Sequence, residues 1–183
     1  MTAMAAIDAL LDRNQRFAAG RTYEHGPIYP NAGVCVVTCL DQRTDPANFL
    51  GLKLGDAAVI RNAGGRINRA VIDDLSFVTY LFETVIKPEG QLFEVAIIHH
   101  TKCGTRFLAD AEFRHHFAAR VGGDEAMLQT EAVSDPHQTV IHDVALLRAS
   151  TVVSKRITVS GHVYDVDTGV VTTVLAAASM QTV

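Results

Sequence analysis

Short apolar runs alternate with longer amphipathic stretches along this chain. The short runs are rich in β-branched residues and end in polar or glycine positions, which is typical of buried strands. They occupy residues 34–39, 57–61 and 93–98. The longer stretches repeat apolar residues at helical spacing, which predicts amphipathic helices. They occupy residues 3–18, 67–86, 106–121 and 136–149. The segment 151–166 contains further strand, and a final strand is expected near 170–175.

This order of elements predicts an α/β fold. Strands that alternate with helices form βαβ units, so we expect a mainly parallel β-sheet flanked by helices. A chain of 183 residues suits one domain, 1–183, with an N-terminal helical extension at about 1–20. Residues 20–33 should form a loop, because glycine and proline interrupt them. No internal repeat or long linker divides the chain.

Capping residues and apolar stripes indicate where a helix begins and which face of each helix should be buried. Asp45 as N-cap and Pro46 at the first helical position predict a short helix to about Leu50. Each longer helix should bury its apolar stripe. In 67–86 the stripe is Ile67, Val71, Leu75, Val78, Phe82 and Val85; in 106–121 it is Phe107, Ala111, Phe117 and Val121; in 136–149 it is Val140, Ile141, Val144 and Leu147. The N-terminal stripe of Ile7, Leu10, Leu11 and Phe17 could pack on its own domain or on a partner subunit.

Composition narrows the function classes. A net charge of -4 provides no basic surface for nucleic acid and no polybasic patch for a membrane. No apolar run approaches the roughly 18 residues of a membrane span. The N-terminus lacks a basic start and contains Asp8, so it is not typical of a signal peptide. Three cysteines form no disulfide framework, and cysteines needed as thiolates favour a cytoplasmic location.

Three metal-ligating residues follow two of the predicted strands. Cys39 closes the strand at 34–39, and His100 and Cys103 follow the strand at 93–98. Ligands bind beyond the carboxyl ends of parallel strands, so we expect all three residues at one edge of the sheet. Thiolate and imidazole are zinc ligands, and three protein ligands leave the open position of a catalytic site. Asp41 and Arg43 follow Cys39 at alternate positions and share its side of an extended segment.

The other cysteine and histidine side chains considered are expected to be core or surface residues. His99 should point away from its neighbour His100, as a hydrogen-bonded core histidine. Cys35 lies roughly 13 Å from Cys39 at about 3.3 Å per residue, so it should be a small buried apolar residue. His115 and His116 are adjacent on a predicted helix and should lie at the surface.

Lys102 lies between the two candidate ligands of the loop. It is either a solvated lysine or a cation at the mouth of a pocket, where it would favour an anionic product.

Taken together, the motifs resemble those of the β-class carbonic anhydrases. Cys39-Leu-Asp-Gln-Arg43 is a C-x-D-x-R motif, and an H-x-x-C motif, His100 to Cys103, follows about sixty residues later. The likeness runs from about Val34 to Thr168 and includes Arg61-Asn-Ala-Gly-Gly65. On the residues alone, an ordinary strand-to-helix turn is the favoured interpretation of that last segment, whereas the resemblance makes it a wall of the active site.

The resemblance implies a β-carbonic anhydrase-like fold and a role for each motif residue. Cys39, His100 and Cys103 would bind Zn²⁺, and Arg43 would hold Asp41 away from the metal. Without that pairing, Asp41 could become a fourth ligand. The family's minimal unit is a dimer, so a homodimer or a dimer-based tetramer is expected.

The implied reaction is hydration of carbon dioxide to bicarbonate by a zinc-bound hydroxide. The doublet His99-His100-Thr101 also resembles a short bacterial branch that includes carbonyl sulfide and carbon disulfide hydrolases. One of those compounds is therefore the alternative substrate. A non-catalytic zinc-binding module is the alternative from another class, and the lack of a fourth Cys or His near the motif weighs against it.

Overall fold

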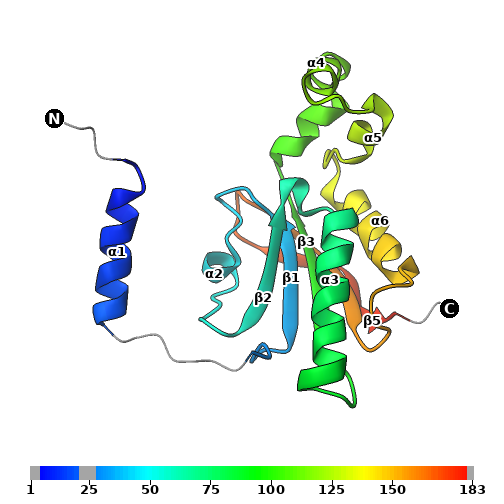
Figure 1. Cartoon of the computed structure of the whole chain (residues 1–183). Helices are drawn as coiled ribbons and strands as arrows, with labels where there is room; N and C mark the ends of the chain where they lie inside the picture. Colours follow the sequence, from blue (N-terminus) through cyan, green and yellow to red (C-terminus); the bar gives the residue numbers. More distant parts are fainter. Residues whose placement is uncertain (1–4, 21–27, 181–183) are drawn as a thin grey trace.

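One five-stranded sheet organises the computed structural model, which describes residues 5–20 and 28–180 (Figure 1). The strand order is β2-β1-β3-β4-β5. The strands are β1 (Val34–Cys39), β2 (Ala57–Asn62), β3 (Glu94–His100), β4 (Thr158–Tyr164) and β5 (Val171–Ser179). β1 to β4 run parallel, and β5 returns antiparallel to β4. The predicted α/β fold with a mainly parallel sheet is therefore confirmed.

One helix precedes β1, and helices connect the parallel strands. They are α1 (Asp8–Ala19), α2 (Pro46–Phe49), α3 (Arg69–Leu81), α4 (Ala111–Val121), α5 (Glu125–Thr130) and α6 (Pro136–Ala149). Two short 3₁₀ segments are η1 (Ala63–Gly65) and η3 (Gly104–Ala109), and a π-helical turn (Phe82–Ile86) extends α3. Asp45 caps α2 as predicted, because its side chain accepts a hydrogen bond from the Ala47 N–H. α5 was not predicted, since a helix this short shows little periodicity.

The main core lies between the sheet and the layer of α3 and α6 (Figure 1). Its fully buried side chains come from all three components and include Val37, Val95, Ile97, Val71, Leu75, Val140, Val144 and Leu147. Each such side chain stabilises the fold by about 1.5–3 kcal/mol. In the stripes expected at 67–86 and 136–149, two residues are exposed against the prediction: Val85 at 70% and Ile141 at 38%. Val85 lies in the π-helical turn, where the helical periodicity of α3 changes.

Two boundaries near the candidate ligands also differ from the prediction. β3 continues through His100, because its pairing with β4 extends to His100 and Tyr164. The single helix expected at 106–121 is divided, since Asp110 ends η3 and caps α4 with its carboxylate. The expected buried stripe of this segment is wrong, because α4 projects beyond the sheet (Figure 1). Phe107, Phe117 and Val121 are 48%, 37% and 52% exposed.

α1 lies apart from the sheet (Figure 1) and contains no buried residue. Its Ile7, Leu10 and Leu11 side chains are about half exposed. The helix begins at Asp8, later than the expected start at residue 3, because residues 5–7 are not helical. Residues 3 and 4 and half of the expected loop, residues 21–27, lie outside the described residues. Within the described ranges, no helix has the length and apolar character to cross a membrane.

Candidate metal centre

Three donor side chains converge beyond the carboxyl ends of β1 and β3. Cys39 is the last residue of β1, His100 is the last residue of β3, and Cys103 follows just before η3. The two strands pair in parallel, so they end at the same edge of the sheet. One ligand atom from each residue lies within 4.8 Å of the other two, and all three residues are buried. This group could hold a metal ion.

His100 directs one ring nitrogen into the group. Its Nδ1 lies 2.9 Å from the Thr101 carbonyl oxygen, which only accepts hydrogen bonds, so Nδ1 carries the hydrogen. Nε2 therefore bears a lone pair, and it is buried with no hydrogen-bond partner among the described residues. A buried acceptor left in this way costs about 1–3 kcal/mol, which a metal ion would offset. A backbone carbonyl that fixes the other ring nitrogen is usual for metal-binding histidines.

The two cysteine sulfurs have the spacing that a tetrahedral metal requires. Cys39 Sγ and Cys103 Sγ lie 3.9 Å apart. Two sulfurs on a tetrahedral zinc ion, each about 2.3 Å from the metal, are ~3.8 Å apart. The hydrogen bond between the two thiols lowers the pKa of Cys103 and raises the pKa of Cys39. The donor types and their spacing therefore fit zinc.

Asp41 and Arg43 form the pair that the motif predicted. Arg43 Nε and Nη2 donate to Asp41 Oδ1 and Oδ2 at 2.9 and 2.6 Å, and the Arg43 backbone N–H also donates to Oδ1. Arg43 Nη2 reaches the Lys102 carbonyl at 3.1 Å, which ties the pair to the Cys103 loop. The hydrogen bonds from Arg43 lower the pKa of Asp41 to about 2. Asp41 is therefore a carboxylate at neutral pH, and Arg43 occupies both of its oxygens.

Several neighbours of the ligands were not identified from the sequence. The Arg61 side chain donates to the carbonyl oxygens of Cys39 and Asp41 at 3.0 and 2.7 Å, so it fixes the chain that leaves β1. The hydroxyl of Thr105 lies 3.2 Å from Cys103 Sγ. Arg61 belongs to the segment 61–65 that the resemblance marked as a wall of the site. Thr105 carried no signal, because threonine next to a ligand is common in loops.

A buried ion pair lies behind the same segment. Arg66 Nε and Nη2 donate to the two carboxylate oxygens of Asp143, each at 2.8 Å, and the Asp143 side chain is 0% exposed. The hydrogen bonds from Arg66 and His99 lower the pKa of Asp143 despite its burial. His99 is itself fully buried, with Nδ1 2.8 Å from Thr139 Oγ1. The interpretation of His99 as a hydrogen-bonded core histidine is confirmed.

The remaining candidates take no part in the Cys39–His100–Cys103 group. Cys35 is buried in the main core, and burial raises the pKa of its thiol to about 12, as expected for a small apolar residue. Lys102 forms an exposed ion pair with Asp167 at 2.6 Å. Asp167 thus already balances the charge of Lys102, which favours the interpretation of Lys102 as a solvated lysine. His115 and His116 are exposed, as predicted.

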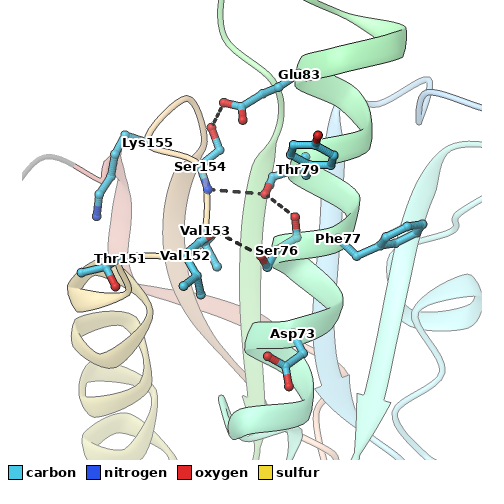
Figure 2. Close-up of a pocket in the computed structure, with 11 residues that line it drawn as sticks. Asp73, Ser76, Phe77, Thr79, Glu83, Thr151, Val152, Val153, Ser154 and Lys155 are labelled. Atoms are coloured by element: carbon cyan, nitrogen blue, oxygen red, sulfur yellow. Dashed lines mark hydrogen bonds between the residues drawn. The ribbon is translucent and has the colours of Figure 1, made fainter.

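A cavity of about 620 Å³ lies between α3 and residues 151–155, and none of its lining residues is a candidate ligand (Figure 2). Polar groups on the two sides of the cavity form hydrogen bonds with each other. Ser76 donates to the Val152 carbonyl, the Ser154 N–H donates to Thr79, and the Ser154 hydroxyl donates to Glu83. These contacts tie the loop before β4 to α3 and to the π-helical turn that extends it.

Comparison with known proteins shows the relationship of the whole chain. No family model matches it. It is 30% identical over 166 residues to β-carbonic anhydrase 1 of Mycobacterium tuberculosis, covering 91% of this chain and 96% of that protein. The crystal structure of carbonic anhydrase from Streptococcus mutans superposes with a TM-score of 0.78 and 34% identity, covering 94% of this chain and 99% of the other.

A carbon disulfide hydrolase of Acidianus sp. is 26% identical over 185 residues, covering 88% of this chain and 85% of that protein. The similarity to the mycobacterial enzyme extends over nearly the full length of both chains. The chain therefore belongs to the β-carbonic anhydrase family.

Proposed function

We propose that this protein is a zinc enzyme that hydrates carbon dioxide to bicarbonate, with Cys39, His100 and Cys103 as the metal ligands. The observation that supports it best is the buried Nε2 of His100, which faces two sulfurs and has no hydrogen-bond partner among the described residues. Zinc bound there would lower the pKa of a water molecule to ~7 and so supply hydroxide near neutral pH. Three protein ligands leave one position for that water.

Asp41 and Arg43 would prepare the site for this reaction. Because Asp41 stays ionised, it can only accept hydrogen bonds, so it would accept one from the attacking hydroxide and orient the oxygen lone pair. Hydroxide adds to the carbon of carbon dioxide, and bicarbonate forms without loss of any other group. Arg43 holds both oxygens of Asp41 and the Lys102 carbonyl, which keeps Asp41 from becoming a fourth ligand.

Hydrolysis of carbonyl sulfide or carbon disulfide is the second candidate. The similarity to a carbon disulfide hydrolase favours it, as does the doublet at His99 and His100. These molecules are linear like carbon dioxide and differ by larger sulfur atoms. An apolar pocket separates such small differences by only about 1–3 kcal/mol, so the shared ligand set does not choose between them. Carbon dioxide remains our choice, because carbonic anhydrases are among the most similar relatives.

Turnover of carbon dioxide, carbonyl sulfide and carbon disulfide by one zinc-loaded preparation tests both candidates. We expect about one zinc per chain, as the single ligand set implies, and the highest specificity constant for carbon dioxide. Cys39→Ser should lose zinc and activity together. Cys35→Ala is the matched control, because Cys35 lies in the same strand but in the core, and it should keep both. Full activity of a chelated, metal-free sample would refute the assignment. A higher specificity constant for either sulfur compound would reverse the choice of substrate.

We also propose that the chain is a single α/β domain that dimerises through its N-terminal extension. We propose a cytoplasmic location, because thiolate ligands stay reduced there. α1 has 12 residues and buries none of them. Helices shorter than about 12–15 residues are marginal in water, so its apolar side chains need a packing surface. A second copy of the chain is the partner that the family implies. Sedimentation should give at least a dimer mass for the full chain, and a monomer after Leu10→Glu with Leu11→Glu; a monomeric wild type would contradict this assembly.

A further inference from the structure

The turn at Gly64 and Gly65 contacts the metal centre through its backbone. The Gly64 N–H donates to Cys39 Sγ at 3.3 Å. Both glycines adopt positive φ values, 86° and 69°, which are strained for other residues. A Cβ on Gly65 would lie 2.8 Å from the Thr38 carbonyl carbon, so the turn packs directly on the end of β1. Because the glycines carry no side chains, other residues must hold this turn in place.

Asp143 of α6 anchors the chain just after the turn. Its carboxylate accepts two hydrogen bonds from the Arg66 guanidinium and one, at 2.9 Å, from the Ile67 N–H. Arg66 also donates to the Thr130 carbonyl at the end of α5. Asp143 and Arg66 have side-chain exposures of 0% and 6%. Charge-assisted bidentate bonds of this kind are short and directional, so they fix the position of the backbone that carries them.

His99 connects the same carboxylate to the turn itself. Its Nε2 lies 3.3 Å from the Gly65 carbonyl oxygen and 3.3 Å from Asp143 Oδ2. Both neighbours are acceptors, so Nε2 carries a hydrogen that faces both of them. His99 of β3 therefore holds the Gly65 carbonyl, whereas Asp143 of α6 holds the two residues that follow it. Gly64, which donates to the metal-ligating sulfur, lies one residue before this anchor.

We propose that Asp143, Arg66 and His99 form a positioning cluster that fixes the Gly64 N–H on the sulfur of Cys39 and so tunes the affinity and acidity of the metal. This inference rests on the proposed zinc function. An N–H bond to a thiolate withdraws charge from the sulfur, which leaves the metal a stronger Lewis acid. Groups that orient ligands from behind typically change metal affinity by about 10–100-fold when removed.

The test removes the link at His99 and then restores it. His99→Leu fills the space without a hydrogen bond, whereas His99→Gln places an amide nitrogen near the position of Nε2. We expect His99→Leu to raise the zinc Kd, measured by competition with a chromophoric chelator, by about 10-fold or more. The sulfur-to-metal charge-transfer band of the cobalt-substituted protein should shift. The midpoint of the pH–turnover profile should move to higher pH, because a more electron-rich sulfur weakens the metal as an acid. His99→Gln should recover most of each change.

Leu147→Ala is the matched control. It removes a buried side chain of α6, one turn after Asp143, from the main core. It should lower stability without changing the zinc Kd or the cobalt spectrum. Asp143→Asn keeps the shape of the side chain and should change the zinc Kd and the cobalt spectrum in the same direction as His99→Leu. It therefore tests the proposal even if His99→Leu does not fold. Unchanged metal readouts in His99→Leu and Asp143→Asn would overturn the proposal, as would an equal change in Leu147→Ala. A wild-type chain that binds no zinc would overturn the proposed function itself.

Discussion

Two aspartate–arginine pairs lie near the candidate metal centre, and they differ in sequence separation and in exposure to solvent. Asp41 and Arg43 lie two residues apart at the rim of the site, where the Arg43 side chain is 44% exposed and the Asp41 side chain 13%. Asp143 and Arg66 lie 77 residues apart and are almost wholly buried. Both arginines bind both oxygens of their aspartate. The same chemical pairing therefore occurs once where water competes with it and once where water is excluded.

The difference indicates separate roles. A solvated ion pair contributes little to folding, typically 0.2–1 kcal/mol, so the rim pair is free to serve the chemistry of the site. A buried pair costs desolvation when it forms, yet breaking it leaves an uncompensated charge in the core. The inner pair therefore holds β3, α6 and the glycine turn together. We expect the outer pair to control turnover and the inner pair to control stability and metal affinity.

The largest expected effect is on folding. Arg66→Met should lower the free energy of unfolding by about 3–5 kcal/mol, because Asp143 then remains buried without its main partner. Arg43→Met is the matched substitution at the rim and should lower it by less than about 1 kcal/mol. Urea unfolding of both variants with zinc present measures the difference. Equal losses in the two variants would remove the distinction between the pairs.

The second effect is on activity. Arg43→Ala should free Asp41 to bind the metal, so turnover should fall by about 100-fold or more while zinc stays bound. Elemental analysis and stopped-flow hydration measure the two quantities on one sample. Arg43→Lys is the control, because lysine keeps the charge but not the bidentate geometry, and it should recover only part of the activity. Unchanged turnover in Arg43→Ala would exclude the role assigned to the rim pair.

The smallest expected effect is on the acid stability of the metal-free protein. The pKa of Asp41 is lowered to about 2 by Arg43, below the value of about 4 in an unfolded chain. A lowered pKa gives stability that is present above pH ~4 and is lost as the pH falls towards ~2, because the unfolded chain binds protons first. Arg43→Ala should therefore flatten the fall in unfolding free energy across this range. The Asp143 pair should also lose stability as the pH falls, since its pKa is lowered too. An unchanged slope in Arg43→Ala would show that the rim pair is not linked to folding.

The two pairs also mark how far the sequence could be interpreted. The rim pair was predicted, because Asp41 and Arg43 are close to Cys39 in the chain and belong to a recognisable motif. The inner pair was not, because Arg66 and Asp143 lie on separate elements and are ordinary charged residues of predicted helices or turns. His99 was correctly expected in the core, but its partners Gly65 and Asp143 were not.

The sequence by itself determined that Cys39, His100 and Cys103 lie at or just after the ends of two strands, since strand periodicity and the spacing of the motifs are local properties. It did not determine the end of β3, which runs two residues further than expected. It also determined the mainly parallel sheet, because helices separate most of the strands. Only the tertiary structure decided which apolar helix faces are covered, since Leu10 and Leu11 of α1 and Val121 of α4 belong to apolar stripes yet remain about half exposed. The tertiary structure likewise decided that Asp143 and His99 hold the turn behind the metal ligands. Contacts between residues this far apart depend on how α6 and β3 pack together, which no local pattern encodes.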